Sequence, residues 1–262
     1  MTVALRYSTY ARNFIAGVGS WKDAFNGGRM EIYSGAQPAS ADAAATGTLL
    51  CTITNAAGAH TAEVLSAGSV TLTGGASGSL DTLTVDSVDI LGGAVAFNTS
   101  LTQTAADAAV QINRFHSTTD YVATSSGAKI IITALPGTGT SPNGLTVAST
   151  ATTITKTDVN MGTEATGVAA VNGLKYEYPT GGGVAKLASQ TWSGVNAASG
   201  TAGWYRLYGS VADAGGADTN LVYRREDGAI ATSGAELNIN PTAFVAGATT
   251  TISSGTLTIP TL

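Results

Sequence analysis

The stretch NAAGAHTAEVLSAG, residues 55–68, divides the chain into two kinds of sequence. Its small and polar residues are typical of a connector. Before it, the sequence predicts only a helical segment and two strands, Arg29–Tyr33 and Leu49–Thr54, which are too few to enclose a core. We therefore expect both chain ends, 1–60 and 168–262, to build one discontinuous domain. Residues 66–167 would form a module inserted in one of its loops.

The inserted module has the pattern of a small α+β unit. In LDTLTVDSVDILG, residues 80–92, alternating apolar residues on either side of Asp86-Ser87 predict a hairpin. In TAADAAVQINRFH, residues 104–116, we expect a helix with Thr104 as its N-cap. Its apolar face would hold Ala105, Ala109, Ile112 and His116. Strands DYVAT, AKIIITAL and LTVAST follow, with turns at Ser126-Gly127 and in PGTGTSPNG.

The C-terminal part predicts many short strands. LKYEY, VAKLASQTWSG, ELNIN and TISSGTLTIP are separated by turn signals, and NLVYRREDGAIAT has the pattern of a hairpin that turns at EDG. GWYRLYGSV alternates Trp204, Arg206 and Tyr208 against Tyr205 and Leu207. Strands at this spacing indicate a mainly β protein whose discontinuous domain is a β-sandwich or jelly-roll-like fold.

Composition supports a β class and restricts the partners. Charged residues form 11% of the 262 residues, Gly contributes 33, and the net charge is −5. Without a basic cluster, we expect no nucleic-acid partner. The single cysteine, Cys51, cannot form an internal disulfide, as expected for a protein made in a reducing cytoplasm. No apolar run has the length of a membrane span or of a signal-peptide core, so no membrane association or conventional export is expected.

An apolar stripe near the N-terminus predicts an amphipathic helix. Tyr10, Phe14, Val18, Trp21 and Phe25 recur at helical spacing, with Ser8 or Thr9 as the cap. Glycines 17 and 19 interrupt the pattern, so both one helix and two short helices with a bend fit it. The stripe can dock on the core of its own domain or on a neighbouring subunit.

Residues 8–50, STYARNFIAGVGSWKDAFNGGRMEIYSGAQPASADAAATGTLL, resemble the start of a family of tailed-bacteriophage virion proteins. AASGTAGWYRLYGS (197–210), LNIN (237–240) and VAGATTTISSGTLTIP (245–260) resemble its later part. The resemblance covers both ends of the chain and skips the middle. SGSLDTLTVDSVDILG (77–92) and GTGTSPNGLTV (137–147) resemble a second phage-associated unit.

The resemblance implies a structural component of a phage particle, assembled in the host cytoplasm. The leading hypothesis is a head decoration, or capsid cement, protein that binds the major capsid protein or other virion proteins and forms a homo-oligomer, with a trimer as the guess from the class. A tail, neck or baseplate component is the alternative. The polar stretch SGAQPASADAAATGTLL, residues 34–50, would be an ordered surface loop that touches a neighbour.

The sequence contains no constellation typical of catalysis, so we expect no enzyme, no cofactor and no metal. His60 and His116 lack partners at metal-ligand spacing, and Cys51 lies in an apolar strand pattern. The string GTGTSPNG leads into a strand rather than a helix, which does not fit a dinucleotide site. Asp81, Asp86 and Asp89 lack the spacing of a calcium loop.

Aromatic residues of the C-terminal part leave one further hypothesis open. Trp192, Trp204, Tyr205 and Tyr208 would either pack in the core or stack on sugar rings in a receptor- or carbohydrate-binding module. The candidate assembly contacts, which combine the apolar stripe, the polar loop and this strand, are Tyr10, Phe14, Trp21, Phe25, Gln37, Pro38, Trp204 and Tyr208.

Overall fold

The computed structural model describes residues 5–115, 117 and 120–258. The chain divides into two units, each with its own core. One unit, the discontinuous domain, comprises Met1–Glu63 and Ala170–Leu262; the other, the inserted domain, comprises Val64–Ala169. Antiparallel sheets dominate both units, so the fold is mainly β and sandwich-like, as the strand pattern predicted. Within the described ranges, no helix has the length and apolarity needed to cross a membrane.

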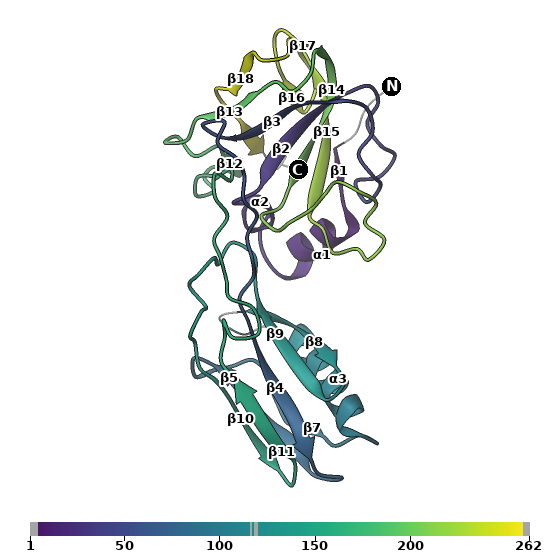
Figure 1. The fold of residues 1–262 in the computed structure, drawn as a ribbon, viewed down its shortest axis with the longest axis vertical. Coiled ribbons are helices and arrows are strands. Elements are labelled where there is room, and N and C mark those ends of the chain that lie inside the picture. Colours follow the sequence, from purple (N-terminus) through teal and green to yellow (C-terminus); the bar gives the residue numbers. More distant parts are fainter. Residues whose placement is uncertain (1–4, 116, 118–119, 259–262) are drawn as a thin grey trace. The chain divides into compact units, whose positions relative to one another are not determined.

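The discontinuous domain contains two short helices and strands from both ends of the chain (Figure 1). Its elements are β1 (Arg6–Tyr7), α1 (Thr9–Gly17), α2 (Trp21–Phe25), β2 (Arg29–Ser34), β3 (Leu49–Asn55), β12 (Gly183–Ala185), β13 (Trp192–Val195), β14 (Gly200–Tyr208), β15 (Arg225–Ala231), β16 (Leu237–Asn238), β17 (Ala243–Phe244), β18 (Thr249–Ile252) and β19 (Thr256–Thr258).

The main sheet of this domain needs both chain ends. Its strand order is β1-β15-β14-β2-β3-β13-β18, so the N-terminal strands β2 and β3 lie between C-terminal strands (Figure 1). β14 is central, with Arg206 opposite Glu31 of β2 on one side and opposite Asp227 of β15 on the other. Both faces of β14 are covered: from Trp204 to Tyr208, no side chain is more than 5% exposed. The alternation of side chains along residues 204–208 therefore does not separate a buried face of β14 from a solvent-exposed one.

The N-terminal apolar stripe forms two helices. Ser8 caps α1 by accepting a hydrogen bond from the Ala11 amide, and Ser20 begins α2 with a capping box that includes Asp23. Between them, a Cβ atom at Gly19 would lie 2.8 Å from the Phe14 ring, so the break requires a residue without a side chain. Phe14 and Phe25 are buried at 2% and 0% exposure, which places the stripe on the core of its own domain.

The inserted domain packs a helix with two four-stranded sheets. Its elements are β4 (Ala67–Gly74), β5 (Ser79–Val85), β6 (Val88–Asp89), β7 (Val95–Ala96), α3 (Leu101–Arg114), β8 (Tyr121–Ser126), β9 (Lys129–Ala134), β10 (Val147–Thr152) and β11 (Thr155–Val159). The predicted hairpin is confirmed, because Val85 pairs with Val88 across a turn in which Asp86 and Ser87 both have positive φ. Apolar residues of both sheets and the helix share one core.

Three local predictions are wrong. Helix α3 begins one turn earlier than predicted, because Ser100 is its N-cap and the hydroxyl of Thr104 donates to the Ser100 carbonyl from inside the helix. LKYEY forms only isolated bridges, at Leu174 and Tyr176, instead of a strand. EDG is not a turn: residues 226–228 lie inside β15. His116, which was expected on the helical face, lies outside the described residues.

Candidate functional site

Four consecutive charged residues, Arg224 to Asp227, are buried in the discontinuous domain. Their exposures are 2%, 0%, 3% and 0%, although charged residues are scarce in this chain. Fully buried charges are rare in proteins and are stable only with partners. Successive side chains of a strand point to opposite faces, so Arg225 and Asp227 lie on one face and Arg224 and Glu226 on the other. The two faces have different partners.

The face of Arg225 and Asp227 carries two bidentate ion pairs. Arg206 donates from Nε and Nη2 to the Asp227 carboxylate at 2.7 and 2.8 Å. Arg225 donates in the same manner to Asp213, at 2.7 and 2.6 Å. Burial acts to lower the pKa of Arg206, but the hydrogen bonds and charge of Asp227 outweigh it and raise the pKa. The Arg206 guanidinium therefore stays charged.

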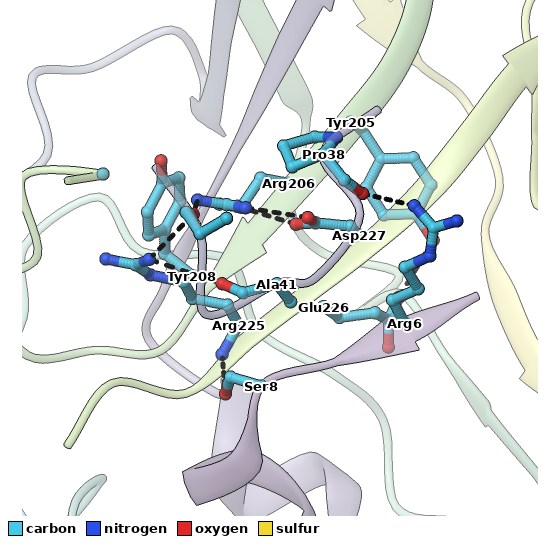
Figure 2. Close-up of polar contacts among 12 residues, drawn as sticks. Arg6, Ser8, Pro38, Ala41, Tyr205, Arg206, Tyr208, Arg225, Glu226 and Asp227 are labelled. Carbon is cyan, nitrogen blue, oxygen red and sulfur yellow. Dashed lines mark hydrogen bonds and ion pairs between the residues drawn. The ribbon is translucent and has the colours of Figure 1, made fainter. Parts of the chain in front are cut away.

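These arginines also hold the polar loop of residues 35–48, which connects β2 to β3. Arg206 donates from Nη1 to the Ala43 carbonyl at 2.9 Å, and Arg225 donates to the Ala41 carbonyl at 3.3 Å. Arg6 of β1 donates to the carbonyl of Pro38. Figure 2 shows the three guanidinium groups together with Pro38 and Ala41 of the loop. The loop thus supplies acceptors that satisfy buried cations.

The same loop is tied to helix α1 and to a C-terminal loop. Asp42 accepts hydrogen bonds from the Thr9 amide at 2.9 Å and from the Thr9 hydroxyl at 2.8 Å. The Asp218 amide donates to the Asp42 carbonyl at 2.7 Å. Ala39 and Ala44 remain exposed. The 35–48 loop is therefore an ordered segment with a fixed inner side and a small, uncharged outer side.

A second charged group extends the same face toward a groove. Arg29 pairs with Glu31 at 2.8 Å and stacks on the ring of Tyr208, with its Cζ 4.1 Å from the ring centroid. A groove of about 470 Å³ is lined by Arg29, Glu31, His60 and Asp213, among others. Nε2 of His60 lies 3.0 Å from the Gly27 carbonyl, and burial lowers the pKa of this imidazole. Arg29 and Glu31 of the groove are paired with each other, and the Asp213 carboxylate is paired with Arg225.

The opposite face holds Glu226 among aromatic side chains. Trp21 donates from Nε1 to Glu226 at 2.6 Å, and the Tyr205 hydroxyl donates to its other oxygen at 2.9 Å. Burial raises the pKa of Glu226, while the hydrogen bonds from Trp21 and Tyr205 act to lower it. This carboxylate therefore links helix α2 to the central strands β14 and β15.

Arg224 occupies a different environment on that face. Its Cζ lies 5.2 Å from the centroid of the Phe14 ring. None of its three guanidinium nitrogens has a hydrogen-bond partner among the described residues. Burial accordingly lowers the pKa of Arg224 to about 10. Of the four buried charged residues from Arg224 to Asp227, Arg224 is therefore the one expected to contribute least to stability.

Burial changes the interpretation of the predicted assembly contacts. Phe14, Phe25, Pro38, Trp204 and Tyr208 are buried, so they are not available to a neighbouring subunit. This corrects the prediction for those five residues, because Phe14 and Phe25 pack into the core of their own domain, both faces of β14 are covered, and Pro38 lies on the inner side of the 35–48 loop. The remaining predicted contacts are partly exposed: Tyr10, Trp21 and Gln37.

The sugar-stacking hypothesis meets the same difficulty. Trp192, Trp204, Tyr205 and Tyr208 are at most 5% exposed. Tyr33 already stacks on Trp204, with ring centroids 4.6 Å apart and an interplanar angle of 11°. These four side chains therefore pack in the interior and offer no platform to a sugar in solvent.

The environments of Cys51 and Asp81, two residues that the sequence analysis considered for chemistry, are described by the structure. Within that part of the chain, no group of three or more His, Cys, Asp or Glu side chains could hold a metal ion. Cys51 is fully buried, and burial raises the pKa of its thiol to about 11. Asp81 accepts hydrogen bonds from Ser79 and from Thr152, in the latter case at 2.8 Å. His116 lies outside the described residues.

Sequence reasoning missed the buried charges. Arg206, Asp213 and Arg225 were not among the predicted site residues, although they form the centre of the network. One signal was available: in a chain with 11% charged residues, RRED at 224–227 is the densest charged segment and lies beside apolar strand patterns. The partners of these charges come from distant parts of the chain, which composition does not indicate.

Ser8 offers a direct test of how α1 is attached. Its buried hydroxyl oxygen accepts from the amides of Ala11 and Arg225, and it donates to the Tyr223 carbonyl at 2.7 Å. Replacing Ser8 with Ala is expected to lower the free energy of unfolding by about 1–3 kcal/mol, since it removes a cap and leaves buried groups unsatisfied. Ser20→Ala, at the exposed cap of α2, is the control and should cost about 0.5–1 kcal/mol. Equal losses in denaturant unfolding would contradict the special role of Ser8.

No family model, curated protein or solved structure matches this chain in the three comparisons.

Proposed function

We propose that this protein is a structural component of a tailed-bacteriophage particle, and that it decorates the head by binding the major capsid protein. One observation carries the proposal: segments that resemble the phage virion family are joined to one another by the buried network. Arg206 of the second segment (197–210) donates to the carbonyl of Ala43 in the first segment (8–50), and within the first segment Asp42 accepts from the amide of Thr9. The resembling residues thus build one site in space, although they are far apart in the sequence.

The geometry of the 35–48 loop suits a contact with a rigid protein lattice. Its inner side is held by buried arginines, so little conformational freedom is lost when its outer side binds. Ala39 and Ala44 are exposed, small and uncharged, which allows close approach without desolvating a charge. A protein that bridges neighbouring capsomers in this manner would raise the cost of separating them. We expect a homo-oligomer on the virion, with a trimer as the leading arrangement.

The test is binding to preformed heads that lack this protein. Purified protein should co-sediment with such heads and increase their resistance to heat. Ala39→Arg combined with Ala44→Arg should reduce binding at least tenfold, since each new charge is desolvated at the contact, worth about 1.4 kcal/mol or more in total. Thr232→Arg, at another exposed position of the same domain, is the matched control and should bind normally.

One outcome would count against head decoration, and another only against the contact made by the 35–48 loop. Failure to bind heads, with incorporation only into tails, would favour a tail, neck or baseplate component. Normal binding by the double variant would remove the loop from the contact while leaving the location in the head intact. The copy number per virion separates the locations independently, because a lattice protein is present in far more copies than a neck or baseplate ring.

A further inference from the structure

A small cleft opens on the Glu226 face of the discontinuous domain. Its volume is about 90 Å³, room for roughly three water molecules at about 30 Å³ each, or for a ligand group of a few non-hydrogen atoms. Aromatic rings, aliphatic side chains and two carboxylates line it, and none of the described lining residues is basic. They include Trp21, Tyr176, Trp192, Tyr205, Glu226 and Glu236.

Glu226 differs from the other buried carboxylates in its partners. Asp227 and Asp213 each form a bidentate pair with an arginine. Among the described residues, no cation pairs with Glu226, and its hydrogen bonds come from the neutral donors of Trp21, Tyr205 and Tyr7. A buried carboxylate without a counter-charge is costly, and each of its oxygens can accept a further hydrogen bond. The cleft therefore favours a cation.

Tyr176 gives an independent indication of a ligand. Its side chain is 6% exposed and lines the cleft, and its hydroxyl has no hydrogen-bond partner among the described residues. Its ring makes edge contacts with Trp21 and Trp192, at centroid distances of 4.9 and 5.2 Å. A buried hydroxyl without a partner leaves an acceptor and a donor unused. A ligand with N–H donors would satisfy the acceptor.

We propose that this cleft binds a primary ammonium group on an aliphatic stem, the chemistry shared by a lysine side chain and a free alkylamine. The ammonium would donate to the Tyr176 hydroxyl and to the carboxylate of Glu226, and the aromatic rings add cation–π attraction. Val184, Leu237 and Ile252 provide apolar surface for the stem. A guanidinium group is larger and planar, so it fits this volume less well. The proposal does not depend on the phage function.

The experiment uses the full chain and two probes, n-butylammonium and Nα-acetyl-lysine N-methylamide, with n-butanol as the uncharged control. Binding is followed by calorimetry and by tryptophan fluorescence, because Trp21 and Trp192 line the cleft. We expect saturable binding of the ammonium probes and none of butanol. Saturation by butylammonium alone would identify free amines as the ligands, and saturation by both would include lysine side chains.

Two variants locate the binding. Tyr176→Phe keeps the ring and removes only the hydroxyl, and it should weaken binding about tenfold. Glu226→Gln removes the charge and should weaken binding at least as much. Tyr178→Phe, at a side chain that is 81% exposed, is the control and should bind as the unaltered protein does. The proposal is overturned if no probe saturates, if butanol binds equally well, or if Tyr176→Phe binds unchanged.

Discussion

Replacing Arg206 with methionine is expected to lower the free energy of unfolding of the discontinuous domain by about 3–5 kcal/mol. The variant keeps an unbranched side chain of similar length but leaves Asp227 buried at 0% exposure without its bidentate partner. It also leaves the Ala43 carbonyl without the Arg206 donor. Denaturant unfolding followed by tryptophan fluorescence is the measurement, because residues 21, 192 and 204, the three tryptophans, all lie in this domain.

Two further variants interpret the result. Arg12→Met, at an exposed arginine of α1, should change the stability by no more than about 0.5 kcal/mol. Arg206→Met combined with Asp227→Leu should recover part of the loss, since an apolar pair of similar volume often replaces a buried ion pair at little cost. If Arg206→Met lowers the free energy of unfolding by less than about 1 kcal/mol, the ion pair between Arg206 and Asp227 contributes little to the stability of the domain.

Arg225, the first residue of β15, and Arg224, which precedes it, should respond in opposite ways. Arg225→Met is expected to cost about 3–5 kcal/mol, because it removes the bidentate partner of Asp213 and a donor to the 35–48 loop. Arg224→Met should cause no loss and is expected to stabilise the domain. Its guanidinium has no hydrogen-bond partner among the described residues, whereas methionine retains the contact with Phe14 without a buried charge.

The comparison is matched because the two residues are adjacent and equally buried, at 2% and 0% exposure. The same fluorescence-detected unfolding measures both variants. If Arg224→Met loses as much stability as Arg225→Met, the Arg224 guanidinium has a partner such as bound water. The inference that Arg224 contributes least to stability among the four buried charged residues would then be wrong.

Local sequence patterns were sufficient to predict those elements whose structure depends on contacts between residues close together in the sequence. The hairpin at Asp86-Ser87 was predictable because the turn and its alternating flanks are contiguous in the sequence. The start of α3 was missed by one turn because Ser100 and Thr104 are both good capping residues, and only the backbone direction decides between them.

Long-range contacts overrode local signals elsewhere. Asp227-Gly228 is a strong turn signal, yet both residues lie in β15 because Asp227 pairs with Arg206 on the adjacent strand. Gly228 is needed there for another reason: a Cβ atom would lie 2.5 Å from the ring of Tyr205. No local window of sequence contains these partners.

The candidate site was only partly predictable for the same reason. The 35–48 loop was expected to be ordered, and its hydrogen bonds agree with this. Its inner contacts could not be predicted, because the arginines bind main-chain carbonyls, which every residue has. Tyr176 and Glu226 were missed because the cleft is assembled from α2, β15 and the segment that follows the inserted domain.

The use of main-chain acceptors has an evolutionary consequence for the 35–48 loop. The arginines of β1, β14 and β15 recognise the path of the backbone and not the identity of Pro38, Ala41 or Ala43 at the carbonyl. Exposed side chains such as Ala39 and Ala44 can therefore vary while the path is kept. Such a loop can change its exposed surface by substitution without loss of the fold, and it is a natural position for displaying a short foreign peptide.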